Sequence, residues 1–241
     1  MMKKLFGLFL CACLLFGFQS CNRNEASDVP VRVLLVTRGN FDREHFAILM
    51  SQLPIVYTQV QHPYAHAMLT PDIVENYDVV LLFDTPQYIS EEAQQNFIAM
   101  LEKGIGVVAL HHAIWSYDSW SEFVQILGGR GHHYPWMKNG VEQPRSTYRH
   151  DVEMTIGVLD KSHPITQGIT DFVIIDEVYG GIELLPTIHP LLSSDSGAPL
   201  VAWTHEYGNS RIVTFTLGHC RRAWEHPSFI QFLSQAILWA R

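Results

Sequence analysis

The chain is poor in cysteine and in cations, and it has no long apolar run beyond its first twenty residues. It holds four Cys in 241 residues. Only Cys220 lies beyond position 21, so neither an internal disulfide nor a cysteine zinc cluster is expected in the folded part. The 16 Lys and Arg against 24 Asp and Glu give a net charge of −8, which argues against a nucleic-acid partner. No fixed-length repeat is present, which excludes a solenoid.

Several common catalytic signatures are also missing. The chain has no G-x-S-x-G nucleophile elbow, no phosphate-binding P-loop and no G-x-G-x-x-G loop. What it does have is 47% hydrophobic residues, enough for a sizeable core, and 13 His. Histidine is the side chain whose ordinary pKa lies nearest to neutrality, so the His residues are the first candidates for a site.

The first twenty residues have the pattern of a signal peptide. Residues 1–4 are a short basic start, and residues 5–18 are almost wholly apolar. About fourteen residues span roughly 21 Å as a helix, less than a bilayer core requires. Residues 1–20 are therefore predicted to be a cleaved leader.

The end of this leader predicts a lipid anchor. Ser20-Cys21 resembles a bacterial lipoprotein cleavage site. This predicts a lipid on Cys21, a tether over residues 21–29, and export to the bacterial envelope with membrane attachment only through the lipid. The alternative is ordinary secretion with an incidental Cys.

Apolar runs and helical patterns alternate along the first half of the mature chain. The expected strands are Val31–Val36, Ile55–Val60, Asp78–Phe83 and Gly106–Leu110, and the expected helices are 42–53, 90–103 and 119–127. This alternation predicts an α/β fold, a doubly wound and mostly parallel sheet with helices on both faces.

The second half is expected to be less regular, within one domain over 30–241. Residues 128–150 read as a long polar loop. Short strands are expected at 151–157, 172–176, 200–203 and 211–217, the last two joined as an antiparallel hairpin by Tyr207–Ser210. A closing helix is expected over 227–240.

Polar side chains follow several predicted strands. In open α/β sheets ligands bind beyond the carboxyl ends of the strands. Arg38 and Asn40 follow the first strand, Asp84 the third, His111-His112 the fourth, and His219 and Arg221 the last. Because neighbouring residues on a strand point to opposite sides, at most one of His111 and His112 is expected to face the cleft directly. The ends of these strands therefore predict one shared site.

A set of segments resembles the ThuA-like (trehalose utilisation) domain family. They are GVVALHHA (106–113), Trp120-x-x-Phe123 to Gly129, HPITQG (163–168), DEVY (176–179), Trp203, YGNSR (207–211), LGH (217–219) and ILWA (237–240). The resemblance implies a class I glutamine amidotransferase-like, flavodoxin-like fold and a link to sugar catabolism. Amidotransferases of that superfamily carry a Cys on the turn after a central strand. This chain carries His111-His112 there, so thiol-dependent glutamine hydrolysis is not expected.

The chain also departs from the family pattern at two positions. It has Arg38-Gly39-Asn40 where Gly-Gly-His is common, and Cys220 where Asp or Asn often follows the Gly-His near the end. Cys220 is not expected to be a nucleophile, because an activated thiol needs a base beside it, and consecutive residues such as His219 and Cys220 point apart on an extended segment.

The leading hypothesis is an exported enzyme that acts on a disaccharide or keto-sugar by His and carboxylate acid–base chemistry. The candidate catalytic residues are His111, His112, Asp84, Glu177 and His219. The candidate substrate-binding residues are Arg38, Asn40, Trp115, His132, His133, Tyr134, Asp176, Tyr179 and Arg221.

Two alternatives stay open. In the first, a divalent metal such as zinc assists the reaction, held by His111, His132 and His219. In the second, the chain is a non-catalytic sugar-binding lipoprotein. The sequence leaves the exact sugar and the oligomeric state undetermined.

The lipid anchor is testable in cells. Labelled palmitate should enter the wild-type chain and should not enter a Cys21→Ser variant, because the thiol is the acceptor. Gel fluorography of the two proteins is the measurement, and equal labelling would contradict the anchor.

Overall fold

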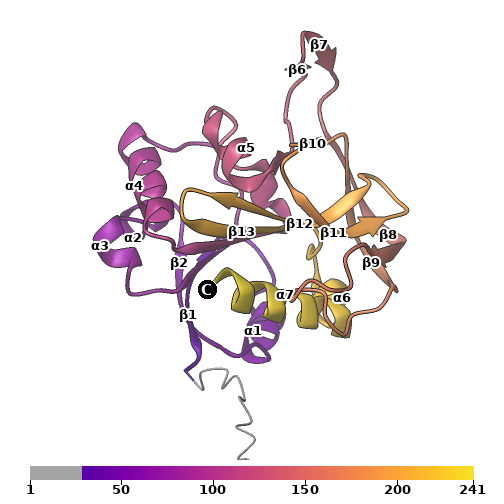
Figure 1. Cartoon of the computed structure of the whole chain (residues 1–241), viewed down its shortest axis with the longest axis horizontal. Helices are drawn as coiled ribbons and strands as arrows, with labels where there is room; N and C mark the ends of the chain where they lie inside the picture. The colour runs from indigo at the N-terminus through magenta and orange to yellow at the C-terminus, as the bar shows by residue number, and fades with distance from the viewer. Residues whose placement is uncertain (1–28) are drawn as a thin grey trace, which may run out of the picture.

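The computed structural model describes residues 29–241. The predicted leader, Cys21 and residues 21–28 of the tether lie outside the described residues. The main sheet consists of β1 (Val31–Thr37), β2 (Ile55–Gln61), β3 (Val79–Phe83), β4 (Gly106–Leu110), β8 (Thr147–Val158), β9 (Phe172–Gly180), β11 (His189–Ser194), β12 (Leu200–Tyr207) and β13 (Ser210–Phe215). Its strand order is β2-β1-β3-β4-β13-β12-β11-β8-β9 (Figure 1).

Seven helices and one 3₁₀ turn accompany the sheet in the described part of the chain. They are α1 (Arg43–Ser51), α2 (Ala65–Met68), α3 (Pro71–Val74), α4 (Glu91–Glu102), η1 (His111–Trp115), α5 (Glu122–Leu127), α6 (Arg221–Trp224) and α7 (Pro227–Ala240). None of the helices in residues 29–241 has the length and apolar character needed to cross a membrane.

The first five strands in the sheet order confirm the predicted α/β class. β2, β1, β3, β4 and β13 pair in parallel. Every residue of β3 and β4 is buried, as expected for strands covered on both faces. After β1 the chain adds β2 on one side of β1 and then β3 and β4 on the other side. Such a switch point opens a crevice at the carboxyl ends of the strands.

Alternating side chains of the strands divide the core into two layers. Val33 and Leu35 pack with α1, α6 and α7, whereas Leu34 and Val36 pack with α2, α3 and α4. Figure 1 shows α1 and α7 on one side of the sheet and α4 and α5 on the other. The helices on both faces were predicted, and their placement follows from the two-residue period of a strand.

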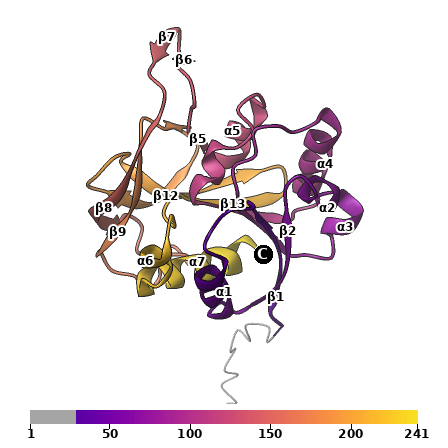
Figure 2. The ribbon, with the colours of Figure 1, turned by 180° about the vertical axis from the view of Figure 1, so that it is seen from behind.

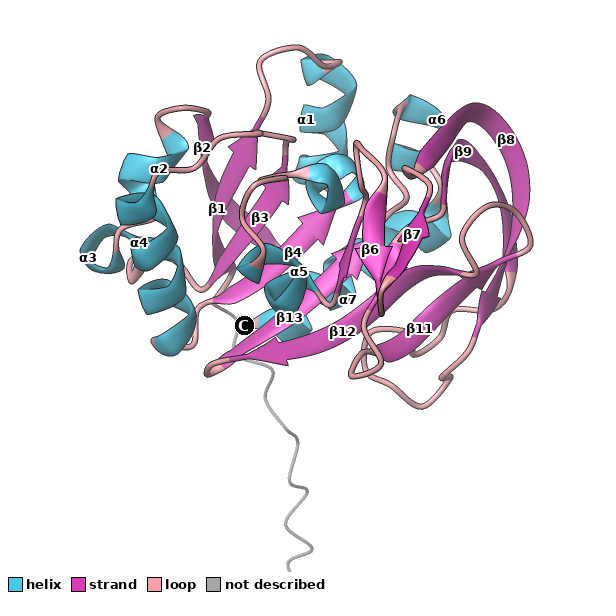
Figure 3. Cartoon of the chain, turned by 90° about the horizontal axis from the view of Figure 1, so that it is seen from above, coloured by secondary structure: helices cyan, strands magenta, loops and turns pink. Residues whose placement is uncertain are grey.

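The antiparallel part of the sheet is larger than the predicted hairpin. β12 pairs with β13 as expected, and β11, β8 and β9 then extend the sheet antiparallel. Figure 3 shows β8 and β9 curving at the end of the sheet opposite to β1 and β2. The strand β11 was not among the predicted strands, because it contains Pro190, and proline is depleted in strands other than edge strands.

The predicted loop over 128–150 is wrong in detail. It contains β5 (Gly129–Arg130), which pairs with β10 (Glu183–Leu184), the hairpin of β6 (Trp136–Lys138) and β7 (Val141–Gln143), and the start of β8. Figure 2 shows the β6–β7 hairpin projecting from the body of the molecule. The first half of β8 is exposed, so it lacks the apolar alternation that would have identified a strand.

The contact between β4 and the last helix permits no side chain at Gly106. A Cβ there would lie 2.0 Å from the Ala240 carbonyl oxygen, whereas a Cβ on Gly39 would meet nothing within 4 Å. Gly106→Ala should therefore destabilise the fold by about 3 kcal/mol, the upper range of overpacking. Gly39→Ala should leave it within about 1 kcal/mol. Urea unfolding measures both, and equal midpoints would contradict the close packing.

Candidate active site

A pocket of about 370 Å³ lies at the carboxyl ends of the parallel strands, with β8 and β9 as its far wall. Its volume falls within the usual range of small-molecule sites. The predicted residues that line it are Arg38, His111, His112, Trp115, His133, Glu177, Tyr179 and His219, and the lining residues that the sequence analysis missed are Thr85, Tyr148 and His150. Segments far apart in sequence therefore meet here, as the strand ends predicted.

His111 stands directly after β4 in a strained backbone conformation. Its φ is 54°, in the left-handed region that costs a non-glycine residue about 1–3 kcal/mol. The ring is 2% exposed, and its Nδ1 lies 2.9 Å from the Thr216 carbonyl oxygen. A carbonyl only accepts hydrogen bonds, so Nδ1 carries a proton and donates it.

Glu177 joins His111 to His219. Its Oε2 lies 3.0 Å from His111 Nε2 and 3.0 Å from His219 Nδ1. The two imidazole nitrogens are themselves 3.2 Å apart. We call these three side chains the His–Glu centre.

The His–Glu centre perturbs the titration of its own members. Burial by itself would raise the pKa of Glu177, but the hydrogen bonds with His111 and His219 outweigh it and hold that pKa well below its usual range. The hydrogen bond with Glu177 raises the pKa of His219, against the opposing effect of burial. The carboxylate is therefore ionised, and the centre favours positive charge next to it.

Asp176 holds the turn that carries His219. This carboxylate is 1% exposed and accepts hydrogen bonds from the backbone N–H of Gly218 at 2.5 Å and of His219 at 2.9 Å. Gly218 has a φ of 115°, which a glycine adopts without strain. The predicted contact of Asp176 with substrate is thus replaced by a positioning role.

His112 lies beside the centre as a neutral ring. Neither ring nitrogen has a hydrogen-bond partner among the described residues, and the residue is 7% exposed. Burial and the positive charges of His111 and Arg38 lower the pKa of His112 to about 2. Both neighbouring His residues line the pocket, because the 3₁₀ turn η1 replaces the extended geometry that would have pointed them apart. A neutral imidazole offers one donor and one acceptor to a bound molecule.

Aromatic side chains form the rest of the wall. Trp115 and Tyr179 make an edge-on contact with ring centroids 5.4 Å apart, and the Tyr179 hydroxyl donates to Glu177 at 3.4 Å. Tyr148 and His150 come from β8, and His150 Nδ1 lies 3.5 Å from the other Glu177 oxygen. These two residues are spaced by two, so their shared face would have been readable had the strand been recognised.

Asp84 does not line the pocket, contrary to expectation. It is 2% exposed and pairs with His62 Nδ1. His62 Nε2 and His66 Nε2 both contact the Tyr117 hydroxyl, at 3.2 and 3.1 Å. Burial raises the pKa of Asp84, and the pair with His62 opposes this effect. Asp84 thus links the end of β3 to the segment after β2, and its neighbour Thr85 reaches the pocket instead.

His132 also lies outside the His–Glu centre. Its Nε2 is 2.7 Å from Glu183 Oε2, and its ring stacks on Trp136 at 4.2 Å. The expected metal set of His111, His132 and His219 therefore does not assemble. Glu177 occupies the third place, because β9 brings it between the two other rings.

Three further predicted binding residues point elsewhere. Asn40 is exposed, Tyr134 is 70% exposed on the way to the β6–β7 hairpin, and Arg221 pairs with Glu225 at 2.7 Å on α6. None of them lines the pocket. The part-buried Cys220 precedes α6 and is likewise outside the pocket lining.

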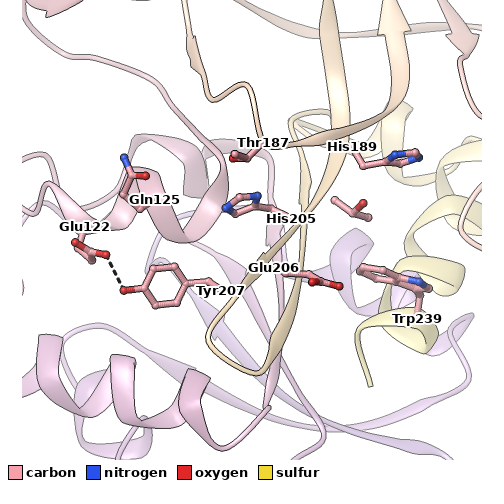
Figure 4. A pocket seen from close by; sticks show the side chains of 9 residues that line it. Glu122, Gln125, Thr187, His189, His205, Glu206, Tyr207 and Trp239 are labelled. Atoms are coloured by element: carbon pink, nitrogen blue, oxygen red, sulfur yellow. Dashed lines mark hydrogen bonds between the residues drawn. The ribbon is translucent and has the colours of Figure 1, made fainter.

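A second, larger cavity of about 620 Å³ lies near the β12–β13 turn (Figure 4). Glu122, Tyr207, Trp239 and His205 are among its lining residues. The Tyr207 hydroxyl donates to Glu122 at 2.6 Å. The smaller pocket is the better candidate for an active site, because the titratable side chains of His111, Glu177 and His219 lie within hydrogen-bond distance of one another there.

The fold and its neighbours define the class first. The α/β fold of the described residues resembles that of class I glutamine amidotransferases, and the turn after β4 carries His111 and His112. A ThuA-like protein from Parabacteroides merdae matches with a TM-score of 0.73 and 22% identity over 88% of this chain and 90% of its own. A ThuA-like protein from Bacteroides uniformis matches with a TM-score of 0.68 and 17% identity over 90% and 94%.

The family follows from the sequence model. Residues 32–240 match the ThuA family, described as trehalose utilisation, and the chain belongs to that family. A cytoplasmic protein from Salmonella typhimurium is also similar in fold, with a TM-score of 0.62 and 11% identity over 87% of this chain and 99% of its own. No curated protein sequence matches the chain significantly.

The Asp176 contacts predict a specific loss of stability. Asp176→Ala should lower the free energy of unfolding by about 3 kcal/mol, because two buried N–H groups lose a charged acceptor. Arg221→Ala, which removes an exposed pair, should cost no more than about 1 kcal/mol. Denaturant titration of both variants is the measurement, and equal losses would contradict the positioning role.

Proposed function

We propose that this ThuA family member is an enzyme of carbohydrate catabolism that acts on a disaccharide or a keto-sugar in the pocket of the His–Glu centre. The observation that carries the proposal is Glu177 Oε2 at 3.0 Å from both His111 Nε2 and His219 Nδ1, in the wall of a pocket open to solvent. Sharing of one carboxylate by two imidazoles is an arrangement suited to moving protons.

The proposed chemistry is proton transfer at a hydroxyl, a carbon next to a carbonyl, or a bound water. The ionised Glu177 stabilises positive charge at His219, and Asp176 keeps His219 in place through the backbone. Cys220 takes no part, because it lies outside the pocket lining. Hydrolysis of glutamine by a thiol is therefore not part of the proposal.

The pocket walls suit a sugar. Trp115 and Tyr148 offer aromatic surface, on which the apolar face of a sugar ring packs, and Arg38 offers donors to hydroxyl or carbonyl oxygens. The neutral His112 can donate to one hydroxyl and accept from another. The trehalose utilisation described for the family supports disaccharides and their keto forms as the substrates to try first.

Turnover of trehalose, other disaccharides and their 3-keto forms should be followed by chromatography with the purified protein. We expect at least one to be consumed, with loss of about a hundredfold or more in His219→Ala and Glu177→Gln, the usual scale for lost acid–base catalysis. Cys220→Ser and Arg221→Ala are the matched controls, and we expect both to keep activity within about threefold.

Two results would overturn this proposal. Binding of a sugar by calorimetry without any turnover would identify a sugar-binding protein instead of an enzyme. Turnover that survives in Glu177→Gln and His219→Ala but is abolished in Cys220→Ser would place the chemistry on the thiol.

A further inference from the structure

The hydrogen-bond pattern of His111 leaves an unusual lone pair in the His–Glu centre. Its Nδ1 donates to the Thr216 carbonyl at 2.9 Å, so Nε2 of a neutral ring carries no proton. That Nε2 lies 3.0 Å from Glu177 Oε2. The contact is favourable when positive charge is supplied, either by a proton on Nε2, which makes His111 an imidazolium, or by a metal ion that lies against both atoms.

A third potential ligand atom, which gives up its proton when a metal ion binds, lies at the same spot. His219 Nδ1 lies 3.0 Å from Glu177 Oε2 and 3.2 Å from His111 Nε2. Ligand atoms at 2.0–2.1 Å from a tetrahedral zinc ion are about 3.3 Å from one another. The three atoms are thus nearly as far apart as the ligands on one face of such a tetrahedron.

We propose that His111 Nε2, His219 Nδ1 and Glu177 Oε2 bind a divalent metal ion of the zinc type. Two imidazole nitrogens and one carboxylate oxygen form a known catalytic zinc set, with a further position left to water or substrate. Within residues 29–241, this is the group of three or more His, Cys, Asp or Glu whose ligand atoms come within 4.8 Å of one another.

The surroundings of the three side chains match those of a metal site. Metal-binding His residues usually donate their other N–H to a backbone carbonyl or a carboxylate, as His111 does to Thr216. The Tyr179 hydroxyl lies 3.1 Å from His111 Nε2 and 3.4 Å from Glu177 Oε2, so it contacts both of these ligand side chains and helps to position them. The His111 and Glu177 side chains are 2% and 8% exposed, but the His219 side chain is 31% exposed, so the group opens towards the pocket.

Other His–carboxylate contacts in the described chain lack this convergence. His132 meets Glu183, and His189 meets Asp160, each as a simple pair. These pairs offer matched controls, because they contain the same chemical groups without a third ligand atom. They also separate specific binding from ordinary affinity of surface imidazoles for metal ions.

The proposal deepens the proposed function and rests on it only for the identity of the substrate. A metal ion in this position would supply positive charge that acidifies a bound water or sugar hydroxyl. His150, which lines the pocket and has its Nδ1 3.5 Å from Glu177 Oε1, would then be an imidazole outside the ligand set that is placed to receive the proton. The three members of the centre would hold the ion instead of shuttling protons themselves.

The test is metal binding by the purified full chain, independent of any substrate. After chelator treatment, zinc is titrated calorimetrically, and cobalt is titrated by its visible absorption. We expect one ion per chain, a raised thermal midpoint with zinc, and a cobalt spectrum typical of four-coordinate nitrogen and oxygen ligation.

Variants decide where the ion binds. Glu177→Gln and His219→Ala should weaken zinc binding by about a hundredfold or more, while His132→Ala and His189→Ala should keep the wild-type affinity. Circular dichroism without metal checks that each variant is folded. No binding by the folded wild type of zinc, cobalt, manganese or iron(II) would overturn the proposal. So would binding that His132→Ala or His189→Ala abolishes and Glu177→Gln does not.

Failure of this proposal and failure of the proposed function give different results. A chain that binds no metal but turns over sugar in the presence of chelator contradicts the metal site and keeps the enzyme. A chain that binds one metal through Glu177 and His219 but turns over no sugar keeps the metal site and contradicts the enzyme.

Discussion

The two adjacent acidic residues of β9 are the link on which the site depends. Asp176 accepts the backbone N–H groups of Gly218 and His219, which ties β9 to the turn after β13. Glu177, the next residue, enters the pocket between His111 and His219. Neighbouring residues on a strand point to opposite sides. Asp176 can therefore anchor the turn while Glu177 contacts His219, which the turn carries. The continuous sheet joins the two halves, and this tie fixes the turn that carries His219 against β9.

The antiparallel extension turns an open sheet edge into a pocket. A parallel sheet alone places its strand ends along one edge and leaves them facing solvent. Here β8 and β9 return beside that edge and supply Tyr148, His150, Glu177 and Tyr179. The carboxylate that charges the centre thus comes from the extension, and the two imidazoles come from the parallel half.

The burial of polar groups around the pocket is balanced by partners of specific kinds. Asp84 is paired with His62, Asp176 with two backbone N–H groups, and His132 with Glu183. Buried polar groups are tolerated when they are hydrogen-bonded. His112 differs, because its ring nitrogens have no partner among the described residues. Arg38 Nε is likewise without a partner there, so these two lining side chains are suited to bind hydroxyls of a ligand.

The sequence by itself determined the parallel core and the edge at which a site forms. The segments that form β1, β3 and β4 are almost wholly apolar. Each segment could therefore be predicted as a buried strand from its own residues. Arg38, His111 and His219 could be predicted because each follows a strand. The sequence did not distinguish Asp84 and His132 from Glu177, since all three are polar residues near strand ends or in loops. Only the tertiary structure decided which of them meet, because the choice depends on long-range pairing of β8 and β9. The exposed first half of β8 carries no hydrophobic period from which that pairing could be predicted.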